Sequence, residues 1–175
     1  MEVHPHAGKA KETRMKHAPQ GFSLIELLIV VAIILVISAI AIPNFLRSRI
    51  AANQASAVGS VRLVNTAEVA YSVTYDTGFS TTLAVLGPVP TPGGTPTSTA
   101  ATMIDSVLAS GAKSGYTFTY SSGPSDVSGR INAYQVTAVP LNYFMGTFTY
   151  YSDQSGVIRQ NSTVTASSTD SPIGG

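Results

Sequence analysis

The chain lacks cysteine and tryptophan, and charged residues make up only 11% of its 175 residues. Without cysteine there can be no disulfide, no iron–sulfur cluster, no zinc site with thiolate ligands and no cysteine nucleophile. Low charge combined with ample apolar content is the wrong composition for a disordered chain. A net charge of +1 also disfavours a nucleic-acid-binding protein.

Histidine is confined to the start of the chain, at His4, His6 and His17. The remainder has no imidazole for a Ser-His-Asp triad or for most zinc chemistry. We therefore expect no enzymatic activity, no cofactor and no metal site. A calcium site at Asp126 or Asp153 stays open as an alternative, although turn formation explains both aspartates without a metal.

The chain does contain one long apolar run. Of the 19 residues from Leu24 to Ile42, only Glu26 and Ser38 are polar. As a helix this run is about 28 Å long, close to the ~30 Å thickness of the hydrocarbon core of a bilayer. A buried core helix is disfavoured, because so small a chain has little other structure to surround it. We predict a membrane-spanning helix.

Basic residues flank the run on both sides, and they indicate its orientation. The positive-inside bias favours a cytoplasmic N-terminus. A secretory signal peptide cut after Ala41 is the alternative, and it would release a soluble protein that begins at Ile42. The flanking basic residues are Lys9, Lys11, Arg14 and Lys16 before the run and Arg47 and Arg49 after it.

Glu26 is the one carboxylate in this run. An unpaired charge in an apolar span costs about 3 kcal/mol on insertion scales, so it normally has a partner or a function. The simpler explanation is a carboxylate near the helix end that reaches the headgroup region.

The residues around Glu26 form a specific motif. The stretch Gly21-Phe22-Ser23-Leu24-Ile25-Glu26-Leu27, followed by the apolar run and Pro43, resembles the cleavage and methylation motif of type IV prepilins and type II secretion pseudopilins. The resemblance implies that a prepilin peptidase cuts between Gly21 and Phe22, removes residues 1–21 as a leader peptide and N-methylates the new amine of Phe22. It further implies that Glu26 neutralises the Phe22 amine of an adjacent subunit during filament assembly.

Elementary electrostatics agrees with that role. Cleavage before the apolar run keeps the anchor on the mature chain and creates a cationic amine at Phe22. Glu26 follows four residues later, on the same helix face. In a low dielectric, two paired opposite charges are strongly favoured over two separated ones.

The remaining sequence predicts an α+β, pilin-like fold. We divide it into the membrane and assembly helix over residues 22–43, an amphipathic helix over 44–76, and a globular domain over 77–175. Pro43 has no N–H to donate to the preceding turn, so we expect a helix kink there. The amphipathic stripe consists of Ile50, Ala57, Val61, Val64, Tyr71 and Tyr75, broadened by Val58 and Leu63, with Glu68 as its exception.

The globular domain is expected to hold a small antiparallel sheet of three or four strands that packs on the amphipathic helix. We predict an exposed loop over 79–100, a short helix over Ala101–Ser110 ended by Gly111, and a frayed tail from Gln160. The predicted strands are Tyr116–Tyr120, Ile131–Val139, Thr147–Tyr151 and Val157–Arg159.

These features predict a structural subunit of a type IV pilus-like filament. It would be a single-pass inner-membrane protein before assembly, and part of an extracellular filament or periplasmic pseudopilus afterwards. Its partners would be other pilin subunits, the prepilin peptidase and methylase, the inner-membrane assembly machinery and membrane lipid. A type II secretion pseudopilin is the alternative within the family, and a membrane-anchored or secreted non-enzymatic binding domain is the alternative outside it.

Overall fold

The structure is a computed structural model that describes residues 21–174. The chain divides into two compact units, one that ends at Ile40 and one that begins at Ala41. Of the expected leader peptide, residues 1–20 lie outside the described residues. The domain limits expected at residues 43 and 76 stay predictions.

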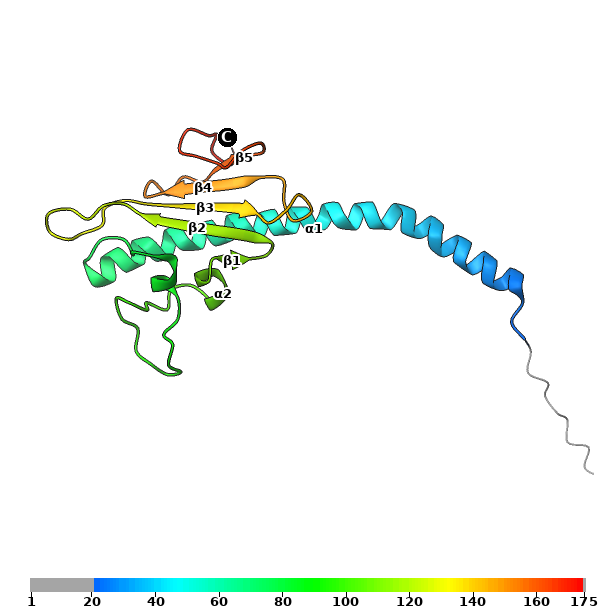
Figure 1. The fold of residues 1–175 in the computed structure, drawn as a ribbon, viewed down its shortest axis with the longest axis horizontal. Coiled ribbons are helices and arrows are strands. Elements are labelled where there is room, and N and C mark those ends of the chain that lie inside the picture. Colours follow the sequence, from blue (N-terminus) through cyan, green and yellow to red (C-terminus); the bar gives the residue numbers. More distant parts are fainter. Residues whose placement is uncertain (1–20, 175) are drawn as a thin grey trace, which may run out of the picture. The chain divides into compact units, whose positions relative to one another are not determined.

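One helix, α1 (Leu24–Tyr75), contains both the apolar run and the amphipathic segment (Figure 1). Pro43 lies inside α1, and the helix is not broken there; the expected kink stays a prediction. In the first unit the large apolar side chains from Leu24 to Ile40 are all exposed. Nothing in residues 21–40 covers them.

The second unit contains a five-stranded antiparallel sheet (Figure 1). Each strand pairs with the next along the chain, so the sheet is a simple meander. It lies along the C-terminal half of α1, which confirms the predicted α+β fold. The strands are β1 (Ala112–Lys113), β2 (Tyr116–Ser122), β3 (Tyr134–Pro140), β4 (Thr149–Asp153) and β5 (Arg159–Asn161).

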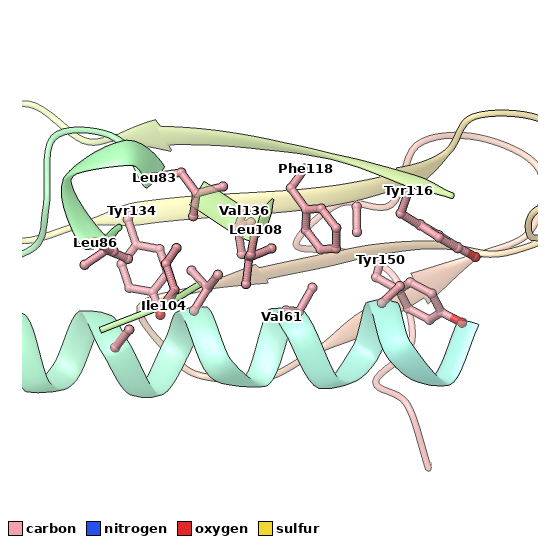
Figure 2. Close-up of a cluster of buried hydrophobic side chains, with 14 of the residues drawn as sticks. Val61, Leu83, Leu86, Ile104, Leu108, Tyr116, Phe118, Tyr134, Val136 and Tyr150 are labelled. Atoms are coloured by element: carbon pink, nitrogen blue, oxygen red, sulfur yellow. The ribbon is translucent and has the colours of Figure 1, made fainter. Parts of the chain in front are cut away.

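The hydrophobic core forms between α1 and the sheet (Figure 2). The predicted stripe is confirmed at Ala57, Val61, Val64 and Tyr71, which are buried. The inclusion of Leu63 in the stripe is wrong, because Leu63 is exposed. It follows Val61 by two residues and therefore lies about 200° around the helix from it. Facing the stripe are Leu83, Leu86, Ile104, Leu108, Tyr116, Phe118, Tyr134, Val136, Ala138 and Tyr150.

Four strands were predicted and the sheet has five. Most of the predicted strands are shifted along the chain. Only the first predicted strand falls wholly within an observed one, β2. The second begins at Tyr134 rather than Ile131, because Ile131 forms isolated bridges with Gly78 and Ser125 instead. The last two strands begin two residues later than predicted, and β1 is too short to show an alternating pattern.

The helix predicted over Ala101–Ser110 is shorter in the structure. Only α2 (Ser106–Ala109) is helical. The preceding residues are held outside the helix, because the N–H groups of Ala101 and Met103 donate to the carbonyls of Val85 and Leu86 at 2.8 Å, and Thr102 between them has a left-handed φ of 55°. The predicted stop at Gly111 is confirmed by its left-handed φ of 81°.

The segment after α1 is less exposed than predicted. Residues 79–86 are not an exposed loop, because Ser80 and the two leucines of a 3-10 helix, η1 (Leu83–Leu86), are buried. The chain enters this segment through Gly78, whose φ is 80°. A Cβ at Gly78 would overlap the backbone of Ile131, so only glycine fits this close approach.

The expectation of a frayed tail from Gln160 is wrong. The Gln160 N–H donates to the Ser171 carbonyl at 3.0 Å, and the Ile173 N–H donates to the Ile158 carbonyl at 2.9 Å. The Asn161 side chain donates to Asp170 Oδ1 at 2.7 Å. The Asn161 and Asp170 side chains also accept from the N–H groups of Thr163 and Ser167. Bonds of this kind order the Ser/Thr-rich segment, which composition alone could not reveal.

Candidate processing and assembly site

The Gly21–Phe22 peptide bond lies just outside α1. Residues 21–23 have no regular structure, and the helix begins at Leu24. A Cβ placed on Gly21 would meet no atom within 4 Å, and Phe22 is 82% exposed. Within residues 21–174 neither helical hydrogen bonding nor packing shields the bond.

Glu26 caps the start of α1. The Ser23 N–H donates to Glu26 Oε2 at 2.9 Å, and the Ser23 carbonyl accepts from the Leu27 N–H at 3.2 Å. Ser23 is thus the residue that precedes the first turn, with Glu26 three positions later. This is one arm of a capping box, and a negative charge here also suits the positive end of the helix dipole.

The sequence analysis missed this capping role. Its signal was present, because serine followed three residues later by glutamate, immediately before an apolar run, is the pattern of a helix start. The resemblance to prepilins drew the interpretation toward a partner in another chain. The structure adds a partner in the same chain.

The carboxylate of Glu26 keeps capacity for a second partner. A carboxylate has two oxygens with about four lone pairs in all, and Oε2 accepts the Ser23 N–H. Glu26 takes part in neither of the two ion pairs formed among residues 21–174. The group is therefore exposed, held in place, and able to accept a cation.

The predicted site residues fall into two places along α1. Gly21 and Phe22 lie just before α1, and Glu26 lies in its first turn. Pro43 lies 17 residues after Glu26, in the interior of the helix.

Residues 16–42 match the family model of the prokaryotic N-terminal methylation motif. The chain carries the hallmark of type IV prepilins and pseudopilins. The predicted family resemblance is thereby confirmed, over the short part of the chain that contains the cleavage site and the apolar run. No curated protein and no solved structure matches the chain.

Among the described helices, α1 is the one long and apolar enough to cross a membrane, judged by length and composition. None of its most apolar 18-residue stretch is buried. An exposed apolar helix that directly follows a prepilin-type motif is the arrangement of a membrane anchor.

The two candidate calcium ligands are occupied by turn hydrogen bonds. Asp126 accepts from the Ser128 hydroxyl at 2.6 Å and from the Asn132 amide at 2.8 Å. These bonds hold the pKa of the Asp126 carboxyl well below its usual range. Asp153 accepts from the Ser155 N–H at 2.9 Å. In residues 21–174 no group of three or more His, Asp or Glu side chains could hold a metal ion.

A second carboxyl group on α1 has a role that the sequence analysis did not assign. Glu68 is 0% exposed, and it accepts the Ser80 N–H at 2.8 Å and the Ser80 hydroxyl at 2.6 Å. The Tyr120 hydroxyl in turn donates to the Ser80 carbonyl at 2.9 Å. This network fixes the segment after α1 to both helix and sheet. The sequence did contain a sign of this role, because Glu68 is an acidic residue at a position of the apolar stripe.

Proposed function

We propose that this chain is a structural subunit of a type IV pilus-like filament. It enters the inner membrane as a prepilin with a cytoplasmic N-terminus. A prepilin peptidase then cuts between Gly21 and Phe22 and N-methylates Phe22, and the mature chains assemble through their apolar helices. The observation that carries the proposal is Glu26, a carboxylate without an ion-pair partner among the described residues, one turn from the matched cleavage motif.

Cleavage changes the charge next to Glu26. In the precursor the Phe22 nitrogen is a neutral amide, whereas after cleavage it is a cationic amine. Methylation of an amine keeps this positive charge. Because Glu26 uses Oε2 to cap its own helix, its other oxygen can accept the amine of an incoming subunit without releasing the helix start.

The exposed apolar surface of α1 supports assembly through this helix. Soluble monomers rarely expose contiguous apolar patches larger than a few hundred Å². Apolar side chains from Phe22 to Phe45 are exposed around the whole helix. Such a surface requires lipid before assembly and neighbouring helices afterwards.

A long surface filament and a short periplasmic pseudopilus use the same motif. The location of the assembled material therefore separates the two members of the family. Our proposal expects this chain in filaments that are sheared from the cell surface, whereas a pseudopilin stays with the envelope.

The test is the mass and N-terminal sequence of the chain from membranes and from sheared surface material. We expect a start at Phe22 with one added methyl group in both, and filaments by electron microscopy. A start at Ile42 would establish a secreted protein instead, and an uncut chain would establish a simple anchor.

A matched pair of glycine variants sharpens this test. Gly21→Ala should leave most of the chain uncut, because it adds a side chain next to the bond that is cleaved. Gly59→Ala also adds a methyl group where no atom lies within 4 Å, but far from the cleavage site. It should be processed normally. Equal processing of the two variants would contradict cleavage after Gly21.

A further inference from the structure

We propose that the loop between β3 and β4 of one chain docks on the second half of α1 in another copy of the chain. Three apolar side chains of the loop cover an exposed part of that helix, which we call the valine face. The valine face consists of Asn65, Thr66, Val69, Ala70, Val73 and Thr74. The loop and the valine face both belong to the second unit. The assignment rests on the proposed filament subunit, and it names the surfaces through which neighbouring subunits meet.

The tip of the loop exposes three large apolar side chains within four residues. Leu141 is 64% exposed, Tyr143 is 73% exposed and Phe144 is 65% exposed. The two aromatic rings contact each other edge to face, with centroids 6.3 Å apart. Single exposed apolar side chains need no explanation, but a cluster of this kind marks an interaction site.

The backbone of the loop holds these rings in place. The Asn142 side chain accepts from the Phe144 N–H, and the Asn142 carbonyl accepts from the Met145 N–H, both at 3.0 Å. The Leu141 N–H donates to the Gly115 carbonyl at 2.9 Å. Because the backbone is already ordered, binding at this tip needs little further loss of conformational entropy.

The valine face is an apolar part of α1 that nothing in residues 21–174 covers. Val69 is 58% exposed and Val73 is 78% exposed. Four side chains with the spacing i, i+3, i+4 and i+7 surround a hole on a helix surface, and here they are Thr66, Val69, Ala70 and Val73. Because Ala70 has only a methyl group, the hole is open to a side chain from another chain, which enters it as a knob does in a coiled coil.

The loop and the valine face lie at opposite ends of the second half of α1. The loop lies beside Asn53, whose Nδ2 donates to the Met145 carbonyl at 3.0 Å, and Figure 1 shows it at the end toward which β3 runs. Val69 follows Asn53 by 16 residues, which is about 24 Å along the helix and about 160° around it. The loop of one chain therefore cannot cover the valine face of the same chain.

This placement suits a second copy as the occupant. Two different surfaces of one chain form a head-to-tail contact, in which every added copy leaves one loop and one valine face free. Such contacts either close into a ring or continue as an open helical filament. A pairing of two valine faces would instead satisfy both copies at once and stop at a dimer.

The area of the contact explains why it needs the rest of the assembly. An aromatic side chain buries roughly 150–250 Å² when it is fully covered, so the exposed parts of the Tyr143 and Phe144 rings bury only about 200–350 Å². A stable complex buries about 800 Å² per partner. The contact therefore forms only where something else already holds the copies at a high effective concentration. In the proposed filament the apolar helices do this, which makes another subunit the occupant.

The experiment uses the absence of cysteine from the chain. Tyr143→Cys in the loop and Thr74→Cys at the rim of the valine face leave Phe144 and both valines in place. We expect sheared filaments of this double variant to give a ladder of dimers, trimers and longer cross-linked chains on oxidation. Each single variant should stay monomeric, and the two single variants produced in one cell should give dimers only.

Two controls show whether the contact is specific. Val164→Cys combined with Thr74→Cys places the first cysteine at another exposed apolar position, 62% exposed in the tail, and should give no ladder. Ala70→Leu fills the hole, and in the Tyr143→Cys, Thr74→Cys background it should reduce cross-linking by about tenfold. Ala70→Ser keeps the hole open and should leave cross-linking unchanged.

The outcomes separate this contact from filament assembly itself. Filaments in electron micrographs without a ladder overturn the contact and leave the proposed filament subunit standing. A natural chain that forms no filaments overturns both. If only the double variant forms no filaments, the two single variants produced together decide, and an absence of dimers overturns the contact.

Three further results also overturn the contact. Cross-linking of Thr74→Cys alone means that two valine faces pair with each other. A ladder from Val164→Cys with Thr74→Cys means that cross-linking does not report a specific docking. Equal cross-linking with Ala70→Leu and Ala70→Ser means that no side chain enters the hole.

Discussion

Two carboxyl groups lie on the same helix in opposite environments. Glu26, in the first turn of α1, is exposed among exposed apolar side chains, and its bond from the Ser23 N–H leaves room for a cation. Glu68, in the second half of α1, is wholly buried, and Ser80 occupies both of its oxygens.

The difference separates a group that completes the fold of one chain from a group that, in our proposal, joins two chains. A buried polar group must find its hydrogen-bond partners within the fold, because leaving them unmade costs about 1–3 kcal/mol per group. Glu68 meets that requirement within its own chain. Glu26 has no ion-pair partner among residues 21–174, and in the proposed filament its partner is the Phe22 amine of another chain. Variants of the two residues should therefore fail in different assays.

The largest effect is expected for Glu26→Gln. The glutamine oxygen can still accept the Ser23 N–H, as in a capping box with glutamine, so the start of α1 is preserved while the charge is removed. The Phe22 amine of each incoming subunit would then lack a counter-charge, at a cost on the order of 3–5 kcal/mol. We expect processed protein in the membrane and almost none in sheared filaments, measured by paired immunoblots and electron microscopy.

Ser38→Ala is the matched control for this variant, because it removes the other polar side chain of the apolar run without changing charge. Its filament yield should be normal. A normal yield from Glu26→Gln as well would show that the carboxylate has no role in assembly and serves only as a helix cap.

The next largest effect is expected for Glu68→Ala, and it should appear in folding rather than assembly. The change leaves the buried Ser80 N–H without its acceptor, removes the shortest hydrogen bond of the Ser80 hydroxyl and creates a cavity, which together should lower the free energy of unfolding by about 3 kcal/mol. The measurement is urea unfolding of the detergent-solubilised chain. Near-ultraviolet circular dichroism of tyrosine can follow it, because all eight tyrosines lie in the second unit.

Two further variants provide a scale for the loss of unfolding free energy expected for Glu68→Ala. Ser80→Ala removes the hydroxyl but keeps the backbone N–H bond to Glu68, so it should cost about 1 kcal/mol. Val73→Ala changes a side chain on α1 that is 78% exposed, and its effect should lie within about 0.5 kcal/mol. Equal stability of Glu68→Ala and Val73→Ala would mean that the buried network contributes nothing.

The comparison of the two carboxyl groups also explains what could be predicted from the sequence. The apolar run and the alternation of Tyr116–Tyr120 are local patterns, so the helix and β2 were predictable. The burial of Glu68 depends on Ser80, which returns to the helix only after the chain has turned at Gly78. The order of the tail likewise depends on pairs such as Asn161 with Asp170. Contacts of this kind have no periodic signal.

The candidate site was predictable for a different reason. Gly21, Phe22 and Glu26 lie within six consecutive residues, so their grouping needs no knowledge of the fold. The capping bond from the Ser23 N–H was equally local, and it was missed although its pattern was visible. The position of the loop between β3 and β4 beside α1 could not be predicted, because the contacts of Met145 with Asn53 and Arg49 span more than 90 residues.

The smallest effect is expected for Asp105→Asn, which tests a carboxylate that is paired within its own chain but exposed. Asp105 caps α2 by accepting the Leu108 N–H at 3.0 Å, and the Lys113 ammonium lies 2.7 Å from its other oxygen. The hydrogen bond from Lys113, followed by that from Leu108, lowers the pKa of the Asp105 carboxyl. Because the folded-state pKa lies below the unfolded value of about 3.9, the stabilisation is present at neutral pH and is lost as the pH falls through the folded-state pKa.

Asparagine keeps the capping oxygen and removes the charge. With the Asp105 side chain 42% exposed, solvent screens the ion pair, and Asp105→Asn should cost only about 0.5 kcal/mol near neutral pH. The measurement is urea unfolding of the natural chain and the variant at neutral pH and at a pH below the folded-state pKa. The difference should vanish in acid and shrink in high salt. A difference that persists unchanged in acid would mean that the charge of Asp105 is not its source, and that an exposed carboxylate paired within its own chain adds nothing measurable to this fold.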